Sequence, residues 1–407
     1  MLAESWREEK IAGKYPRSQR GRSHMSLSVE VGVYYFPNYH ADPRNEGRYG
    51  KGWTEWDLVR AAAPRWPGHR QPVVPAWGYF DEADPVWMER QIDLAADHGI
   101  TTFIFDWYWY NDGPFLDRAL DEGFLKSANR SRLKFALMWA NHNWSEMFPA
   151  GPNPIWEAEL QYPGAVTAQT WDGMTRVLVE RYFTQPNYLR IDGKPYFSFF
   201  ELPRFVESMG GLSEASEGLA LLRDRAIAAG LPGVHLNAMT SNVGGTVGSH
   251  SGGDVTNTIT QLALDSVTDY CWVHQHDPDS DGFPVGSYEN AMISNVAAWD
   301  GIPGRFALPF YPNVSMGWDC SPRCSPAFPY EKRGYPWTAI YGGNTPELFR
   351  QALQQQRAWA ESHHAAMVTL NAWNEWTEGS YLLPDTVCGN QYLEAVRSVY
   401  ASKKQHP

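Results

Sequence analysis

The chain is poor in cysteine, in positive charge and in long apolar runs. Four of its 407 residues are cysteine, too few for a fold held together by disulfide bonds. Lys and Arg total 34 against 46 Asp and Glu, which gives a net charge of −12. A chain this acidic lacks the positive field that binding to nucleic acids or anionic membranes requires. No run reaches the about 20 apolar residues of a membrane-spanning helix, so we expect neither nucleic acid nor a membrane among its partners.

Several motifs of cofactor and nucleophile chemistry are also missing. The sequence contains no Gly-rich dinucleotide turn after its first apolar run, no phosphate-binding Gly-Lys-Ser/Thr loop and no Gly-x-Ser-x-Gly elbow. Its close histidine pairs, His274 with His276 and His363 with His364, do not follow a zinc-binding pattern. We therefore expect no cofactor and no catalytic metal.

The segment DPDSDGFPVGSYE comes near to a calcium-binding loop. Asp277, Asp279 and Asp281 have the required spacing, and Gly282 follows them as such a loop demands. The twelfth position, however, is Tyr288 instead of the bidentate Glu. We favour a solvated acidic loop, with a structural calcium site as the alternative.

Cys320 and Cys324 flank the tripeptide SPR in an irregular stretch. A disulfide bond between them would close a small loop and would suggest an exported enzyme. Two free thiols are the alternative, and the sequence leaves both open.

Aromatic side chains are abundant, with 19 Trp, 21 Tyr and 18 Phe. Flat rings with polar edges match the apolar faces of sugar rings and reach their hydroxyl groups. A large aromatic core would give the same composition, so a sugar-binding cleft and an aromatic core remain equal alternatives at this point.

From residue 31 onward, apolar runs alternate with amphipathic segments. The runs predict strands at 31–37, 101–109, 133–141, 194–201, 234–241, 269–275, 305–313 and 365–376. The amphipathic segments predict helices at 84–99, 171–183, 216–229, 289–299, 346–361 and 390–401. Strands that are apolar throughout are typical of parallel sheets, which are buried on both faces.

Eight such strands with helical crossovers predict an α/β fold, a single (β/α)8 TIM barrel with elaborated loops at its C-terminal face. An open doubly wound sheet is the alternative, and the missing dinucleotide turn disfavours it. We assign residues 26–407 to the barrel domain. Residues 1–25 are charged and lack an apolar centre, so we expect a disordered tail or a cloning remnant rather than a signal peptide, and the localisation stays open.

The segment NAWNEWTEG follows the last predicted strand and carries two acidic residues three positions apart. Glycoside cleavage needs one carboxylic acid to protonate the departing oxygen and a second carboxylate to act as base or nucleophile. The flanking tryptophans would raise the pKa of one acid, so that it holds a proton at neutral pH. We predict Glu375 and Glu378 as the catalytic pair, with a helix cap or an Arg salt bridge as the structural alternative. Glu201 ends another strand and is a weaker candidate for the partner acid.

Polar and aromatic residues follow the other predicted strands, at the rim where barrels carry their chemistry. We predict that they hold a sugar through stacking and hydroxyl contacts. The predicted substrate-binding residues are Tyr35, His40, Trp56, His69, Gln71, Asp106, Tyr108, Asn141, Asn143, Glu201, Trp373 and Asn374.

Several motifs in one order point to a family. They are YYFPNYH (34–40), GKGWTEWDLV (50–59), GHRQPVVPAWGYFD (68–81), MWANHNW (138–144), GWDCSPR (317–323) and NAWNEWTEG (371–379). Together the chain resembles the WbsX-type proteins, which are related to glycoside hydrolase family 99, over about residues 33–400. Two positions depart from the pattern: His142 stands where WbsX-type sequences commonly carry an acid, and Thr377 where family 99 carries His.

The resemblance implies a barrel that cleaves glycosides without a metal. Family 99 enzymes are retaining endo-α-mannosidases, in which a base removes the proton of the sugar's 2-hydroxyl and a 1,2-anhydro sugar forms. Carried over, Glu375 is the base and Glu378 the acid/base. An α-linked rhamnoside shares the axial 2-hydroxyl and is equally compatible. A polysaccharide-cluster glycosyltransferase and a non-catalytic carbohydrate-binding barrel are the alternative functions; the expected partner in each case is an oligosaccharide or polysaccharide.

Overall fold

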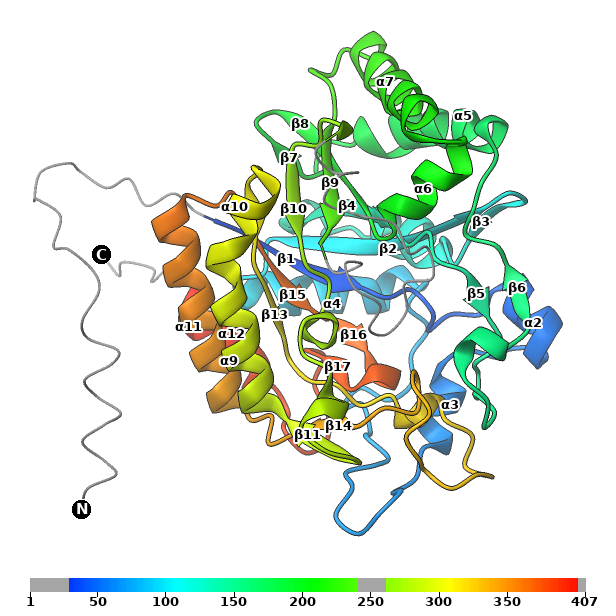
Figure 1. The fold of residues 1–407 in the computed structure, drawn as a ribbon, viewed down its shortest axis with the longest axis vertical. Coiled ribbons are helices and arrows are strands. Elements are labelled where there is room, and N and C mark those ends of the chain that lie inside the picture. Colours follow the sequence, from blue (N-terminus) through cyan, green and yellow to red (C-terminus); the bar gives the residue numbers. More distant parts are fainter. Residues whose placement is uncertain (1–28, 241–260, 402–407) are drawn as a thin grey trace, which may run out of the picture.

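The computed structural model describes residues 29–240 and 261–401, and the tail predicted at 1–25 lies outside these ranges. A parallel sheet forms its centre (Figure 1). Its strands are β1 (Glu30–Tyr35), β2 (Thr102–Tyr110), β4 (Lys134–Trp139), β8 (Lys194–Phe199), β9 (His235–Met239), β10 (Ser266–Thr268), β12 (Phe310–Tyr311), β13 (Asn313–Ser315) and β15 (Met367–Asn371). They are joined in the order β12-β10-β9-β8-β4-β2-β1-β15-β13, and each neighbouring pair is parallel.

The two ends of this order are consecutive in the chain, which closes the sheet into a barrel. Only Pro312 separates β12, which pairs with β10, from β13, which pairs with β15. The carbonyl of Pro312 accepts a hydrogen bond of 3.0 Å from the amide of Thr369 on β15. The two segments therefore act as one bent strand, and the (β/α)8 barrel predicted from the sequence is confirmed.

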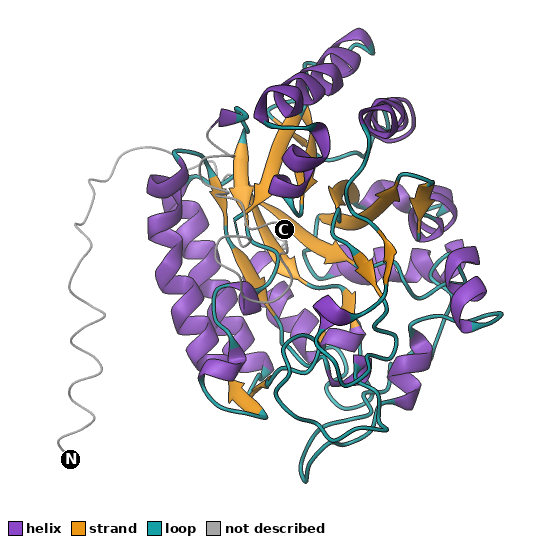
Figure 2. Ribbon diagram, turned by 45° about the vertical axis from the view of Figure 1, so that its right-hand side comes forward, coloured by secondary structure: helices purple, strands orange, loops and turns teal. Residues whose placement is uncertain are grey.

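Helices surround the barrel (Figure 2). The main ones are α4 (Pro85–Asp97), α5 (Ala168–Val177), α6 (Leu202–Met209), α7 (Leu212–Ala228), α9 (Tyr288–Ala298), α11 (Pro346–His363) and α12 (Gln391–Tyr400), and the shorter ones are α2 (Pro43–Tyr49), α3 (Trp56–Ala61) and α10 (Ile302–Phe306). Side-chain caps fix several of their starts: Asp84 accepts from the amide of Val86 (2.9 Å), and Thr345 accepts from that of Leu348 (3.2 Å). The described part of the chain contains no helix that is both long and apolar enough to cross a membrane.

Short strands extend the loops. They are β3 (Gly113–Phe115), β5 (Trp144–Ser145), β6 (Leu160–Tyr162), β7 (Arg190–Ile191), β11 (Val285–Ser287), β14 (Ile340–Gly342), β16 (Asn374–Glu375) and β17 (Ser380–Tyr381). β16 pairs with β17, and β5 pairs with β6. These hairpins lengthen the segments that follow β15 and β4, at the end of the barrel where parallel strands point their carboxyl ends.

The prediction of a strand at 269–275 is wrong. The sixth strand, β10, ends at Thr268, and the apolar run after it forms a loop with a 3₁₀ turn at Trp272–His274. The indole of Trp272 donates to the carbonyl of Asn313 (2.9 Å), so a buried loop accounts for the apolar run. Periodicity does not separate such a loop from a buried strand. The strand predicted at 305–313 begins too early for a similar reason, because residues 302–306 form α10.

Much of the aromatic excess lies in the core. In the part of the chain that the structure describes, eight tryptophans are among the largest fully buried side chains: Trp56, Trp139, Trp171, Trp272, Trp299, Trp337, Trp373 and Trp376. The domain boundaries predicted at residues 26 and 407 stay a prediction.

Candidate active site

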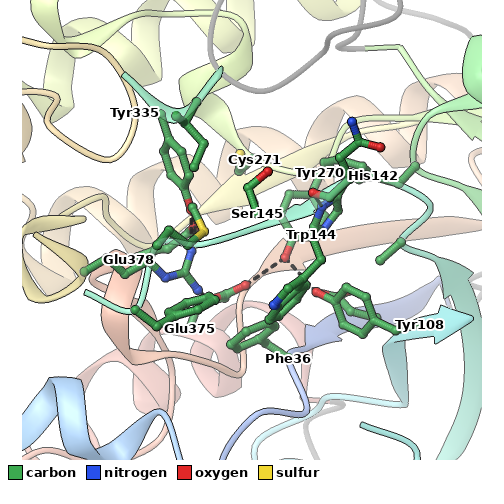
Figure 3. A pocket seen from close by; sticks show the side chains of 18 of the residues that line it. Phe36, Tyr108, His142, Trp144, Ser145, Tyr270, Cys271, Tyr335, Glu375 and Glu378 are labelled. Atoms are coloured by element: carbon green, nitrogen blue, oxygen red, sulfur yellow. Dashed lines mark hydrogen bonds and ion pairs between the residues drawn. The ribbon is translucent and has the colours of Figure 1, made fainter. Parts of the chain in front are cut away.

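A cavity of about 310 Å³ lies at the carboxyl ends of the barrel strands (Figure 3). Its walls come from the residues that end or follow the strands: Phe36 after β1, Asp106 and Tyr108 on β2, Phe200 after β8, and Tyr270 after β10. Glu375 and Glu378, which follow β15, complete the wall. We call this space the Glu375 cavity. Parallel barrels gather the ends of separate strands at this rim, which is why residues far apart in sequence meet here.

Glu375 and Glu378 share a single cation, the buried guanidinium of Arg323. Its Nη2 lies 3.3 Å from Oε2 of Glu375, and its Nη1 contacts Oε1 of Glu378. The hydroxyl of Tyr335 donates a second hydrogen bond to the same Glu378 oxygen, at 2.8 Å. A positive φ of 63° at Gly379 ends the turn that carries Glu378, and a side chain there would collide with Asp319.

A third carboxylate, Glu55, lies on the far side of the same guanidinium. The Nε of Arg323 is 2.9 Å from Oε1 of Glu55. Asn38 donates to the other Glu55 oxygen at 2.6 Å, and the hydroxyl of Thr377 donates to Oε1. Three buried carboxylates therefore surround one positive charge, and this end of the barrel carries an excess of acid.

The remaining oxygen of Glu375 faces a tyrosine. The hydroxyl of Tyr270 lies 3.1 Å from Oε1 of Glu375 and 2.8 Å from Oδ2 of Asp106. Burial and the neighbouring charge of Glu378 raise the pKa of Glu375 well above its usual range, while Arg323 opposes the shift. Burial likewise raises the pKa of Asp106, against the lowering effect of the Tyr270 hydrogen bond. Burial thus favours the protonated form of both carboxyl groups, and a guanidinium opposes this effect at Glu375 but not at Asp106.

Aromatic rings form the rest of the walls. Trp144 packs edge-on against Tyr108 with ring centroids 5.2 Å apart. Trp156 lies at the rim with 64% of its surface exposed. Rings of this kind suit the apolar faces of sugars, while the acids suit their hydroxyl groups. Phe36, Phe148, Trp318 and Tyr335 complete this wall.

The end of the cavity near β4 and β8 carries nitrogen-containing side chains. Arg204 pairs with Glu201 and donates from Nη1 to Oδ1 of Asn143 at 3.2 Å. His274 lies half-buried beside the ring of Tyr270, and the partial loss of water around its ring lowers its pKa to about 4. This imidazole is therefore neutral at physiological pH.

The structure brings five of the predicted site residues together in the Glu375 cavity: Asp106, Tyr108, Asn143, Glu375 and Glu378. The other nine do not line it, and most of them brace its walls from behind. Asn374 holds the backbone of Phe36 with two hydrogen bonds, of 2.8 and 2.7 Å. Asn141 does the same for the backbone of Glu201, at 2.7 and 2.8 Å.

The two histidines among these nine each have a carboxylate partner. His40 lies 2.9 Å from Glu82, to which Tyr35 also donates (2.9 Å). His69 is 3.0 Å from Asp319, which also accepts from Gln71 at 2.8 Å.

The two tryptophans among these nine also lie outside the cavity lining and form hydrogen bonds within the protein. Trp56 donates to the carbonyl of Phe80 (2.7 Å), and Trp373 donates to Gln91 (2.8 Å). Both side chains are core residues whose single polar atom is satisfied within the protein.

Residues that the sequence reasoning did not select hold the acids in place. Arg323 and Glu55 both occur in the motifs quoted above, GWDCSPR and GKGWTEWDLV, and that was the available signal. Tyr270 stood inside the wrongly predicted strand, and Tyr335 lies in a loop without a recognisable pattern.

The carboxylates of the acidic segment after His276 accept hydrogen bonds from the segment itself and from Ala339. Asp277 caps the following turn, Asp279 accepts from the amide of Ala339 at 2.5 Å, and Asp281 accepts from that of Ser287 at 3.0 Å. In the ranges described, no group of three or more His, Cys, Asp or Glu side chains is placed to hold a metal ion.

The two cysteines of the SPR segment are both buried free thiols. The Sγ of Cys324 lies 3.4 Å from the carbonyl oxygen of Pro336. Cys320 and Cys324 are therefore not bridged in this structure.

The barrel and the acid pair at its C-terminal rim define a protein with the fold of glycoside hydrolases. A solved endo-α-mannosidase of glycoside hydrolase family 99 from Bacteroides thetaiotaomicron superposes with a TM-score of 0.53 at 13% identity, covering 92% of this chain and 97% of the enzyme. A structure described as a glycoside hydrolase-like protein superposes with a TM-score of 0.58 at 15% identity, covering 94% of this chain and 97% of the other.

The chain belongs to the WbsX family. The family model described as "Glycosyltransferase WbsX" matches residues 31–396. Two curated relatives, both called uncharacterized protein WxcX, come from strains of Xanthomonas campestris pv. campestris and are 26% identical over 392 residues. The match covers 91% of this chain, which spans about half the length of these relatives.

Proposed function

We propose that the protein is a retaining glycoside hydrolase that cleaves α-linked mannoside-like or rhamnoside-like glycans. The observation that carries the proposal is the pair Glu375 and Glu378, three residues apart after the last strand and joined through Arg323 in an aromatic-walled cavity. Glycosidases of the barrel fold place their acids at this rim. The fold shared with family 99 supports the same class of reaction.

The proposed reaction passes through a 1,2-anhydro sugar. Glu375 takes the proton of the 2-hydroxyl, the 2-oxygen attacks the anomeric carbon, and the bond from that carbon to the leaving oxygen breaks as Glu378 protonates that oxygen. Water then attacks the anomeric carbon and gives a proton to Glu378. The bond from that carbon to the 2-oxygen breaks, and the 2-oxygen takes its proton back from Glu375. Two inversions leave the configuration unchanged.

The contacts of Glu378 suit an acid/base. Among the described residues, its hydrogen bonds to Arg323 and Tyr335 both end on Oε1, which leaves Oε2 to carry the transferred proton. Glu375 has Arg323 on one oxygen and Tyr270 on the other, and both contacts stabilise the ionised form that a base needs, against the opposing effect of burial.

The route also restricts the substrate. The 2-oxygen must approach the anomeric carbon from the face opposite the leaving group, which an α-linked sugar with an axial 2-hydroxyl allows. Mannose and rhamnose both meet this condition. The aromatic walls provide the stacking surface that either sugar needs.

The description of the family favours one competing function, a glycosyltransferase that uses a nucleotide sugar. Such an enzyme must bind a diphosphate, which calls for cations with free donors. At the acid end of the Glu375 cavity, the guanidinium of Arg323 is engaged by three carboxylates. This charge distribution supports the hydrolase over the transferase.

The test is release of sugar from a panel of α-mannans, α-rhamnans and other bacterial, algal and plant polysaccharides. We expect release by the wild type with retained configuration, and a fall in kcat on the order of 10²–10⁴-fold for Glu375→Gln and for Glu378→Gln. Glu157→Gln, an exposed acid beside the cavity rim, is the matched control and should keep full activity. An aryl glycoside with a good leaving group should restore the first step in Glu378→Gln but not in Glu375→Gln.

Absence of release from every polymer, together with tight binding of a nucleotide sugar, would establish the transferase instead. Glycan binding without turnover, unchanged by either substitution, would establish a carbohydrate-binding barrel.

A further inference from the structure

The hydroxyl of Tyr270 lies within hydrogen-bond distance of two carboxyl groups at once. It is 2.8 Å from Oδ2 of Asp106 and 3.1 Å from Oε1 of Glu375, and Figure 3 shows it directed at Glu375. A tyrosine hydroxyl has one proton to donate. It can therefore satisfy only one ionised carboxylate, and the second contact is a hydrogen bond only if that carboxyl group carries a proton of its own. Two hydrogen bonds thus require two protons on the three groups.

The surroundings of the two acids decide where the second proton resides. Glu375 has the guanidinium of Arg323 at 3.3 Å, which stabilises its ionised form. Asp106 has no cation within salt-bridge distance among the described residues, and its Oδ1 is buried without a hydrogen-bond partner among them. An ionised Asp106 would be a buried negative charge with one hydrogen-bond donor for its two oxygens, which would lower the stability of the protein. Burying the neutral acid carries a much smaller free-energy cost.

We infer that Asp106 holds a resident proton and donates it to the Tyr270 oxygen, so that Tyr270 donates its own proton to Glu375 and keeps that residue ionised. Asp106 is then a positioning residue, two groups away from the sugar. This inference rests on the proposed function, because it assigns Asp106 a task in preparing the base. It differs from the direct sugar contact predicted from the sequence.

The other groups around the pair do not replace this proton. The charged groups nearest Glu375 are Arg323, Glu378 and Glu55, and the three carboxylates already outnumber the one cation. His274 beside Tyr270 is neutral, since burial lowers its pKa to about 4. The other titratable groups that face the two acids are uncharged hydroxyls and one thiol: Tyr34, Tyr39, Tyr108 and Cys271. Burial raises the pKa of both acids, but the guanidinium of Arg323 opposes the shift at Glu375, whereas no cation in the described part of the chain opposes it at Asp106.

The proton balance of the reaction closes with this arrangement. Glu375 starts ionised and takes the 2-hydroxyl proton as the anhydro sugar forms. It returns that proton to the 2-oxygen when water opens the ring. The protons of Asp106 and Tyr270 stay in place throughout, so each turnover begins with the base ionised again.

Infrared difference spectroscopy tests the inference without any need for turnover. A protonated buried carboxyl group gives a carbonyl stretch that an ionised one lacks. We expect this band at neutral pH in the wild type and in Glu375→Gln, and its loss in Asp106→Asn. A band that disappears in Glu375→Gln but persists in Asp106→Asn would place the proton on Glu375 and overturn the inference, and so would a band that neither substitution removes.

The pH profile of kcat/KM gives a second, independent readout. The amide of Asp106→Asn still donates to the Tyr270 oxygen, so kcat should stay within about tenfold of the wild type and the acid limb should not move. Tyr270→Phe removes a hydrogen bond from ionised Glu375, and the acid limb should shift upward by about one pH unit. A large rise in KM for Asp106→Asn would show that Asp106 contacts the substrate directly. An acid limb that does not move in Tyr270→Phe would show that Tyr270 has a merely structural role. Either result would overturn the inference.

The two proposals can fail separately. A wild type without glycosidase activity overturns the proposed function, while the infrared band still locates the proton. An active wild type whose band survives Asp106→Asn overturns only the inference.

Discussion

The barrel has a cavity at each end, and the two cavities differ in how well their charged side chains are balanced by opposite charges. The second cavity, about 410 Å³ in volume, lies where the strands begin: Lys194 opens β8, His235 opens β9, and Asp265 precedes β10. We call it the His235 cavity. In the Glu375 cavity, by contrast, Glu375 and Glu378 follow β15, and Asp106 lies on β2.

Charges in the His235 cavity are matched locally. Lys194 pairs with Asp265 at 3.1 Å, and the other oxygen of Asp265 accepts from the amide of Leu236 at 2.9 Å. The imidazole of His235 is 2.7 Å from the hydroxyl of Ser266. The Glu375 cavity places three carboxylates on one guanidinium and a fourth acid beside a tyrosine. Such an imbalance lowers stability, and perturbed acids of this kind cluster at functional sites. The contrast therefore supports the Glu375 cavity as the proposed active site.

Removing the shared cation should produce the largest effect. Arg323→Met would leave Glu55, Glu375 and Glu378 without a counter-charge, and we expect a loss of about 3–5 kcal/mol in the free energy of unfolding together with loss of activity. Urea denaturation at pH 7 and pH 5 measures it, and the loss should shrink at pH 5 as the carboxylates take up protons.

Arg323→Lys is the matched variant. One ammonium group cannot reproduce the separate contacts that the guanidinium makes with three acids, so it should restore only part of the stability. If Arg323→Met unfolded at the same urea concentration as the wild type, the charge imbalance described here would not exist.

The next effect is acid lability at the His235 cavity. Burial lowers the pKa of His235 to about 4, below its usual value of 6.5. Between these values the unfolded chain binds a proton that the native protein does not, so stability is complete above pH 6.5 and is lost as the pH falls toward 4. The total is on the order of 3 kcal/mol.

His235→Gln should remove this pH dependence, as measured by urea denaturation from pH 4 to pH 8. His274 has the same sign of shift but is present in both proteins, so its contribution cancels in the difference. Equal slopes for the variant and the wild type would mean that His235 does not titrate differently in the native state.

Asp106 should show the opposite sign at the other end of the barrel. Its raised native pKa means that the folded protein holds a proton which the unfolded chain releases, so the wild type loses stability as the pH rises above the unfolded value. Asp106→Asn does not titrate there and should gain up to about 1.4 kcal/mol per pH unit relative to the wild type over this window. Thermal unfolding across the pH range measures the stability of Asp106→Asn minus that of the wild type. A fall in this difference with rising pH would contradict the assignment.

The fold could be predicted from the sequence more completely than the site. The barrel was predictable because it rests on a pattern repeated along the chain, apolar strands between amphipathic helices. The acid pair was predictable because Glu375 and Glu378 sit three residues apart directly after the last strand. Local patterns of this kind need no knowledge of what lies opposite in space.

The partners of these acids were not predictable from local patterns. Arg323 meets Glu375 across 52 positions of sequence and Glu55 across 268. His40 and His69 looked like binding residues for the same reason, because their carboxylate partners Glu82 and Asp319 lie 42 and 250 positions away. Only the fold shows that each of these imidazoles already has a carboxylate partner.

The smallest effect is expected for the ion pair of the His235 cavity. Lys194 and Asp265 have 38% and 24% of their side chains exposed, so water screens their attraction and the pair contributes about 0.2–1 kcal/mol. Lys194→Met should therefore lower the free energy of unfolding by less than about 1 kcal/mol and leave kcat unchanged. The loss should be smaller still at high salt, because salt screens the pair in the wild type. Urea denaturation at low and high ionic strength measures the loss. Arg323→Met also replaces one cation with a methionine, so comparing the two variants separates the cost of removing a cation from the cost of leaving several buried acids without a counter-charge. Equal losses in the free energy of unfolding would mean that the acids around Arg323 depend on their counter-charge no more than an exposed pair does.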